Sequence, residues 1–377
     1  MQILVWDLPT RLFHWLFALS FAVAWITGDS DTYRDLHVFV GYLMLGLLGF
    51  RLLWGLIGSR YARFASFWFG PMQAIRYVQD ALTRSAPHHI GHNPAGSWAV
   101  YLLLLLGLLV GVTGILVLGG EEQQGMAAGI TLFGGGEALK ELHEGLASFM
   151  LGVVIVHLLG VAAESWLHQE NLTRAMLTGR KHGATIDAIP SAHYLAGGVL
   201  LLLTAAFGAW FFRDDFTATP QRPHIPFVGQ TLPDNTVWRE ECGSCHLAYH
   251  PTLLPARSWT RLMQQQDTHF GESLGLDAAT TAEILAFLQK NSADTELTEP
   301  AYKIKQSIPP NMTPVRITET GYWIDKHREI PDLTWRHPKI GSKANCGACH
   351  LDAEKGTFED AAMHLPDEVA GLSKARK

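Results

Sequence analysis

The stretch LHEGLASFMLGVVIVHLLG, residues 142–160, decides the fold of the first half of this chain. It is one long apolar run that contains two histidines, His143 and His157. Ionisable side chains inside a membrane span are costly, so each one indicates a functional site. The two histidines are 14 residues apart, which is nearly four helical turns and about 21 Å of rise along one face. A single helix can therefore offer a ligand to each of two stacked cofactors.

Apolar runs of similar length recur along the chain, whose 377 residues are 48% hydrophobic and only 17% charged. A bilayer span needs about 20 apolar residues. We therefore predict five transmembrane helices, within the runs Leu12–Thr27, His37–Ile57, Trp98–Leu118, Gly145–Val161 and Tyr194–Phe212. A cleaved signal peptide is the alternative for the first run, but its start lacks a basic segment and a small-residue cleavage site. With a net charge of -6, the chain shows no basic stripe of the kind that binds nucleic acid.

Two more histidines lie in the first two apolar runs, His14 and His37. Helical bundles commonly hold cofactors through ligands on facing helices, and histidine is a common axial ligand of haem iron. We predict two non-covalent b-haems, an inner one held by His14 and His157 and an outer one held by His37 and His143. The alternative for His37 and His143 is an interfacial position facing water. Arg51 is expected either to pair with a haem propionate or to extend to the inner interface.

Lysine and arginine gather in the loops that follow the second and fourth runs, whereas the other two loops between spans are acidic. By the positive-inside rule, the N-terminus is cytoplasmic. Five spans then place everything after Phe212 in the periplasm, so we predict a multi-pass protein of the bacterial inner membrane.

All four cysteines lie in two Cys-x-x-Cys-His pentapeptides, which run from Cys242 through Cys245 to His246 and from Cys346 through Cys349 to His350. Two thiols at this spacing can bond covalently to a haem, and the adjacent histidine becomes its proximal ligand. A zinc ribbon also begins with such cysteine pairs, but it rarely has histidine directly after both. We therefore predict two covalent c-haems, whose attachment outside the inner membrane agrees with the predicted topology.

The distal ligands of the c-haems must come from the other histidines of the soluble half, His250, His269, His327, His337 and His364. His250 follows its own haem motif too closely to reach the opposite haem face. Met363 is a thioether alternative.

Four motifs in residues 1–185 occur in the order WDLPTRLFHWLFALS (6–20), FRLLWGLIGSRYARF (50–64), GHNPAGSWAV (91–100) and the quoted stretch at 142–160. Together they resemble the bacterial cytochrome b561 and nickel-iron-hydrogenase b-subunit family. The resemblance implies two b-haems with the same four histidine ligands and electron exchange with the quinone pool. By similarity to quinone-reactive cytochromes, His92 and Asn93 are candidates for the quinone site. Their alternative role is a helix N-terminus, with Asn93 as the cap and Pro94 as the first helical residue.

Residues 236–377 resemble the small dihaem cytochrome c family, in the segments CGSCHLAYHPTLLPARSWTRLM (242–263), DTHFGESLGL (267–276), DKHREI (325–330) and SKANCGACHLDAEKGTF (342–358). This resemblance implies bis-histidine haems and a partner haem protein. His269 and His327 lie inside the matching segments, so we choose them as distal ligands. Each is 23 residues from a proximal histidine, which suggests that each caps its own haem, although crossed ligation stays open. His337 is the competitor for the second haem.

The expected fold is mainly α. Residues 1–190 form a membrane cytochrome b domain of four transmembrane helices, 191–212 a fifth transmembrane helix, 213–235 a linker, and 236–377 a loop-rich α-helical dihaem domain in the periplasm. Ala278–Lys290 is the clearest amphipathic helix of the last domain. Three prolines, Pro309, Pro310 and Pro314, mark an extended connection between its two haem-bearing halves.

These parts indicate a membrane tetrahaem cytochrome that transfers electrons between the quinone/quinol pool and a periplasmic haem protein or other soluble partner, with net flow expected outward from quinol. Haem iron with two protein ligands has no open coordination site, which suits electron transfer. Whether this amounts to a quinol:cytochrome c oxidoreductase activity stays open, as does a homodimeric state. The alternatives are a b-type anchor of a hydrogenase-like multisubunit oxidoreductase and a haem-based gas or redox sensor.

Overall fold

A computed structural model describes residues 1–30, 33–121, 124–130, 136–217, 231–359 and 362–366. The chain divides into two compact units, one formed by Met1–Leu116 with Glu137–His224 and the other by Val117–Gly136 with Ile225–Lys377. The predicted fifth transmembrane helix belongs to the first unit. Residues 218–230, which make up most of the predicted linker, lie outside the described residues.

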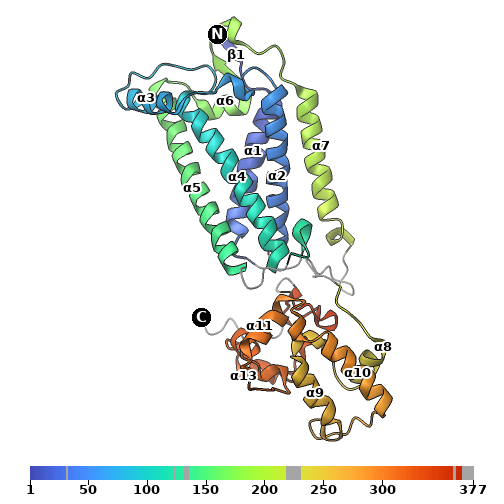
Figure 1. Ribbon diagram of the computed structural model, residues 1–377. Coiled ribbons are helices and arrows are strands. Elements are labelled where there is room, and N and C mark those ends of the chain that lie inside the picture. Colours follow the sequence, from blue (N-terminus) through green and yellow to red (C-terminus); the bar gives the residue numbers. More distant parts are fainter. Residues whose placement is uncertain (31–32, 122–123, 131–135, 218–230, 360–361, 367–377) are drawn as a thin grey trace. The chain divides into compact units, whose positions relative to one another are not determined.

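Five helices in the described part of the chain are long and apolar enough to cross a membrane, as predicted. They are α1 (Leu8–Thr27), α2 (Arg34–Ile57), α4 (Pro94–Glu121), α5 (Gly136–Leu167) and α7 (Tyr194–Phe211). Figure 1 shows them as a bundle in the first unit. The largest difference from the predicted runs is in α5, which is 32 residues long. Because a helix satisfies its own backbone polar groups, it can continue past the end of the apolar run.

The three helices that carry the membrane histidines and their neighbour α4 meet in one apolar layer. Phe21 of α1, Met44 of α2, Leu106 of α4 and Met150 of α5 are buried together. Met150 lies seven residues, about 10 Å of helix, from both His143 and His157. The layer therefore separates the two histidine levels of α5.

Shorter elements lie at the end of the bundle that carries the N-terminus (Figure 1). Strand β1 (Gln2–Leu4) pairs antiparallel with β2 (Arg180–His182), with Ile3 opposite Lys181. The 12-residue helix α3 (Pro71–Leu82) follows the short 3-10 turn Phe64–Ser66, and α6 (Leu172–Thr178) leads into β2. A further 3-10 turn, Thr185–Asp187, lies before α7, whereas the turn Asp215–Thr217 follows the far end of α7. None of these elements was predicted from the sequence.

The second unit contains short helices joined by loops, as expected for a loop-rich α-helical domain. Its helices are α8 (Thr236–Cys242), α9 (Ala256–Gln264), α10 (Ala278–Lys290), α11 (Glu299–Ser307), α12 (Gly321–His327) and α13 (Asp332–Trp335). Its 3-10 turns are Gly125–Ala127, Pro251–Leu253, Gln266–Thr268, Ala293–Thr295, Ile317–Glu319, Cys346–Ala348 and Ala353–Lys355. Helix α10 has the predicted bounds.

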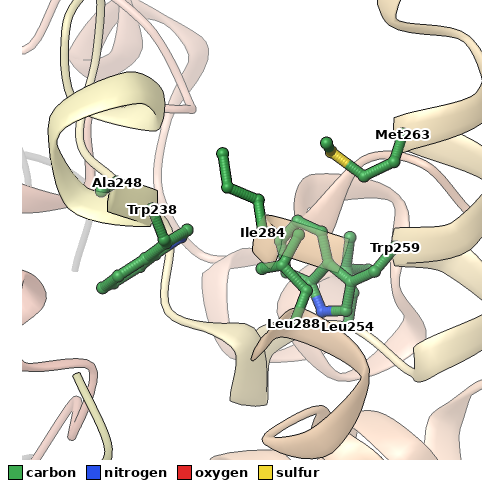
Figure 2. Packing of buried hydrophobic residues seen from close by; sticks show 7 residues of the cluster. All are labelled: Trp238, Ala248, Leu254, Trp259, Met263, Ile284 and Leu288. Carbon is green, nitrogen blue, oxygen red and sulfur yellow. The ribbon is translucent and has the colours of Figure 1, made fainter. Parts of the chain in front are cut away.

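Two apolar clusters hold this unit together. The first contains Trp238, Ala248, Leu254, Trp259, Met263, Ile284 and Leu288, whose side chains Figure 2 shows. The second contains Leu253, Ala293, Ala301, Ile304 and Ile308. Because Leu253 and Leu254 are neighbours in the chain and point into different clusters, the segment after the first haem motif joins the two halves of the domain.

Candidate haem sites

The structure brings eight histidines together in four pairs, which are those expected from the sequence. The ring centroids are 6.5 Å apart in the pair His14–His157 and 6.2 Å apart in His37–His143. They are 6.3 Å apart in His246–His269 and 6.2 Å apart in His327–His350. Each histidine that follows a cysteine pair in the soluble unit thus faces the candidate 23 residues away, which is the uncrossed one of the two arrangements that the sequence left open.

These separations match two imidazoles on opposite sides of one metal ion. A metal–imidazole bond is about 2.0 Å, and the ring centroid lies about 1.2 Å beyond the nitrogen, so two trans imidazoles have centroids about 6.4 Å apart. Directly packed aromatic rings have centroids about 4.5–7 Å apart, so the identity of the paired residues carries the assignment together with the distance. All four pairs have the separation that one haem iron needs.

The pair His14–His157 is placed by the start of α1. Asp7 caps this helix by accepting a hydrogen bond from the Thr10 amide at 3.0 Å, and it also accepts one from Trp54 Nε1 at 3.0 Å. Because Asp7 is completely buried, these bonds fix the start of α1 against the end of α2. His14 therefore sits two turns into α1, at the level of His157 on α5.

The pair His37–His143 is oriented by hydrogen bonds to Nδ1 of each ring. His37 Nδ1 is 3.0 Å from the Ala24 carbonyl oxygen, and His143 Nδ1 is 3.0 Å from Thr113 Oγ1. A histidine whose Nδ1–H is donated to oxygen presents the lone pair of Nε2 to a metal, and such partners strengthen the ligand. Sequence reasoning missed Thr113, although the single threonine of α4 was a usable signal.

Open space lies one turn from one of the membrane histidines. A Cβ added at the half-buried Gly41, four residues after His37, would meet nothing within 4 Å. Since protein interiors are close-packed, unfilled space beside a histidine pair fits a bulky flat group such as a porphyrin.

The first soluble pair is built from two tight turns. His246 follows Cys245, its Nδ1 is bonded to the Leu247 carbonyl at 2.7 Å, and its ring stacks on Tyr249. His269 begins a turn in which Phe270 and Gly271 both have positive φ, of 52° and 106°. Burial, and then the neighbouring His246, lower the pKa of His269. Its imidazole is therefore neutral, the form that binds metal.

The second soluble pair joins the end of α12 to the second haem motif. His327 is the last residue of α12, and its Nδ1 is 2.8 Å from the Trp323 carbonyl oxygen one turn earlier. Its ring stacks on Trp323 at 4.3 Å between centroids. Burial lowers the pKa of His327, although the bond to Trp323 opposes this.

The remaining candidates of the soluble unit are not paired with a proximal histidine. His250 is buried, with Nδ1 2.9 Å from Thr252 Oγ1 and Nε2 3.0 Å from the Pro233 carbonyl oxygen, so both ring nitrogens are engaged. His337 accepts a long contact from the Lys339 amide at 3.4 Å. Met363 bridges His350 through its backbone while its side chain is exposed, and His364 is exposed beside it.

Unpaired polar atoms are buried around the His14–His157 level. They include Arg51 Nη1, His92 Nδ1 and His14 Nδ1. The Arg51 guanidinium lies over the Phe64 ring, 4.6 Å from its centroid, and only 3% of this residue is exposed. Buried polar groups are normally bonded, so these orphaned atoms fit an anionic or hydrogen-bonding group of a cofactor at this level.

The side chains of His92 and Asn93 point in different directions at the start of α4. His92 packs between Trp6 and Phe67, at 4.8 and 4.2 Å between centroids. Burial, followed by the positive charge of Arg51, lowers the pKa of His92 to about 3. Asn93 Oδ1 accepts a hydrogen bond from the Gly96 amide at 2.6 Å, which is the helix-cap role weighed for it.

Two histidine pairs lie in an apolar helical bundle, and two more lie at Cys-x-x-Cys-His motifs. This combination defines a membrane cytochrome. Residues 5–179 match the model of the prokaryotic cytochrome b561 family, and residues 238–358 match that of the dihaem cytochrome c family. The chain belongs to both families, the first through its membrane half and the second through its soluble half. It is a membrane electron-transfer protein with haem b and haem c as cofactors.

Individual relatives agree with this division. The membrane half is 26% identical over 209 residues to a probable Ni/Fe-hydrogenase B-type cytochrome subunit of Azotobacter chroococcum, covering 46% of this chain and 86% of that protein. A corresponding subunit of Escherichia coli is 27% identical over 150 residues, or 33% of this chain and 63% of that protein. The diheme cytochrome c of Rhodobacter sphaeroides is 38% identical, covering 34% of this chain and all of that one, with a TM-score of 0.31.

Proposed function

We propose that this chain is a tetrahaem cytochrome that transfers electrons between the membrane quinone/quinol pool and a soluble redox protein in the periplasm. The observation that carries the proposal is the set of four histidine pairs, all separated by 6.2–6.5 Å. When bound, each haem would supply one-electron transfer, and one histidine pair would hold it. The soluble partner is a haem protein or another small electron carrier.

The residues proposed to hold these groups divide into three sets. His14 with His157 and His37 with His143 bind the two b-haems. Cys242 and Cys245 with His246 and His269, and Cys346 and Cys349 with His350 and His327, bind the two c-haems. Arg51 pairs with a propionate of the His14–His157 haem, and His92 with Asn93 contacts the quinone. The N-terminus faces the cytoplasm, and residues 236–377 form the periplasmic dihaem domain.

Reconstitution of the purified protein in liposomes tests this function. A short-chain quinol is added, and reduction of the c-haems is followed by their alpha band. We expect the c-haems to be reduced only when the b-haems are present, so a His157→Ala variant should respond to dithionite but not to quinol. If the wild type stays oxidised with quinol while a low-potential soluble donor reduces it readily, and oxidised quinone cannot withdraw the electrons, the quinone link is wrong.

A second function has a specific observation in its favour, because the matched relatives of the membrane half are named as B-type cytochrome subunits of Ni/Fe-hydrogenases. In that case the chain would anchor and serve a separate catalytic polypeptide. Purification under mild detergent conditions separates the two functions, since an anchor should retain a stoichiometric oxidoreductase subunit. A gas sensor would differ from both by binding carbon monoxide when reduced.

A further inference from the structure

A cluster of titratable side chains lies at the end of the bundle that carries the N-terminus, outside the four histidine pairs. We call it the histidine–glutamate cluster. It surrounds a cavity of about 40 Å³ lined by His88, His89, Gly91, Asn93, Glu164, His168, Glu170, Leu172 and Lys181. A cavity of this size has room for roughly two or three water molecules.

The members of the cluster come from several elements and lie in series, joined partly by hydrogen bonds and partly by longer approaches that leave His168 Nε2 without a hydrogen-bond partner among the described residues. The Tyr77 hydroxyl of α3 donates to Glu164 Oε1 of α5 at 2.7 Å. The same oxygen lies 3.4 Å from His168 Nε2, one turn further along the chain. The His168 ring then lies 5.2 Å from that of His88. His88 is 40% exposed, so the series reaches solvent at this residue.

The other end of the series reaches the start of α4. The Asn93 side chain lies within hydrogen-bonding reach of the Tyr77 hydroxyl. Asn93 also lines the cavity, whereas its chain neighbour His92 points to Trp6 and Phe67 and has an unpaired Nδ1. The series therefore ends beside the residues proposed to contact quinone, next to the His14–His157 level.

The two glutamates of the cluster, Glu164 and Glu170, differ in their charged neighbours. Glu170 is joined to Lys181 Nζ at 2.9 Å and to His88 Nε2 at 3.3 Å, and its other oxygen accepts the His182 amide at 3.2 Å. Although burial opposes it, these bonds leave the pKa of Glu170 below its usual value. Glu170 is thus a fixed anion. Burial and the bond to Glu164 raise the pKa of Tyr77, and burial lowers that of His89.

Glu164 differs from Glu170 because the described contacts give it no lysine or arginine partner. Its neighbours are Tyr77 from α3, His89 and Asn93 from the loop before α4, and His168 from its own helix, with Lys181 of β2 further off. Glu164 thus lies among neutral donors and histidines beside a water-sized cavity, with no buried cation that depends on it as a partner. Histidine side chains act as proton shuttles in many proteins, and two of them lead from Glu164 toward solvent.

We propose that the histidine–glutamate cluster is a proton-transfer site that serves the quinone reaction, with protons moving between a quinone bound beside Asn93 and solvent through Tyr77, Glu164, His168 and His88. This deepens the proposed function and rests on it. Oxidation of one quinol breaks two O–H bonds and releases two electrons and two protons. The electrons reduce two ferric haem equivalents, and the protons leave one after the other through the cluster. Quinone reduction runs the same steps in reverse, with protons taken from the N-terminal side.

The test uses full-length, haem-loaded protein in liposomes with a short-chain quinol. We expect Glu164→Gln and Tyr77→Phe to slow c-haem reduction by quinol roughly a hundredfold, the scale of lost proton transfer. Their dithionite-reduced spectra and haem contents should equal those of the wild type. His182→Gln is the matched control, because His182 lies at the same end and only its backbone contacts the cluster. The redox-induced infrared difference spectrum should contain a carboxyl band that Glu164→Gln removes.

The two proposals fail in different ways. Wild-type rates and pH profiles in both variants, with the carboxyl band intact in Glu164→Gln, would overturn the proton-transfer site and leave the quinone link standing. A wild type that quinol cannot reduce would overturn both. Tyr77→Phe keeps the experiment decisive even if Glu164→Gln fails to fold, since Tyr77 is buried and phenylalanine preserves its packing.

Discussion

The Thr113 hydroxyl lies 3.0 Å from Nδ1 of His143, across the interface between α4 and α5. Thr113 Oγ1 also donates to the Leu109 carbonyl at 2.8 Å, so its single proton is used within α4 and a lone pair faces the ring. His143 must then be the donor, which leaves its Nε2 lone pair for a metal. A residue with no role in the sequence argument therefore sets the tautomer of a proposed haem ligand.

Replacing Thr113 by valine removes the acceptor for His143 while preserving shape. We expect affinity for the b-haem at the His37–His143 level to fall by about tenfold. Its midpoint potential should rise, because a less basic imidazole stabilises ferric iron less well. Haem titration and potentiometry measure both effects. The control is Thr204→Val in α7, where the hydroxyl bonds only the Leu200 carbonyl at 2.9 Å; an equal effect there would contradict the assignment.

Haem content follows from the four histidine pairs and two cysteine motifs. We expect two extractable b-haems and two covalent c-haems per chain, all low-spin, by pyridine haemochrome assay. His157→Ala should remove one b-haem and leave the c-haem staining unchanged, while His182→Ala should change neither. Loss of every haem in His157→Ala would indicate a folding failure, and retention of both b-haems would exclude His157 as a ligand.

The distal position of the second c-haem distinguishes His327 from His337. Because the cysteines hold the haem covalently, His327→Ala should keep it in place but open one coordination site. The reduced variant should then bind carbon monoxide and show a high-spin spectrum. His337→Ala is the matched variant, and we expect it to stay low-spin. The opposite result would move the ligand to His337.

The ion pair of Glu170 with Lys181 makes the membrane unit sensitive to acid. The folded-state pKa of Glu170 is below its usual value of 4.5, so the stabilisation is present above that pH and is lost as the pH falls through the folded-state value. Glu170→Gln should cost about 3 kcal/mol or more at neutral pH, because Lys181, which is only 3% exposed, is left unpaired. Thermal unfolding at several pH values measures this. Further replacement of Lys181 by methionine should restore most of the loss.

The spans and the histidine pairs could be predicted from the sequence because local residue patterns indicate both. Twenty apolar residues or a Cys-x-x-Cys-His motif can be recognised without tertiary information. The end of the bundle could not be predicted in this way. Lys181 is one of the basic residues in the loop after the fourth apolar run, yet it is buried in β2. Its partner strand lies at the N-terminus, so the pairing depends on contacts between segments far apart in the sequence.

Helix α3 shows a second limit of local patterns. Its exposed apolar residues Met72, Ile75 and Val78 alternate with polar ones such as Gln73 and Arg76, so no continuous apolar run marks it. Its one buried residue, Tyr77, matters through a hydrogen bond to Glu164, 87 residues away. A search for spans passes over such a helix, and a search for metal ligands passes over its tyrosine.

The position of the histidine–glutamate cluster determines whether the proposed reaction generates or dissipates the membrane potential. It lies at the end of the bundle that carries the N-terminus, whereas α7, the last of the five candidate spans, ends at the other end of the bundle. In the proposed topology, electrons entering from the c-haems and protons entering from the cytoplasm would meet at quinone and charge the membrane negative inside. Each electron moved against 100 mV stores about 2.3 kcal/mol. Electron flow outward from quinol would dissipate the membrane potential instead. In the proposed topology, the chain would therefore generate membrane potential in one direction of electron flow and consume it in the other.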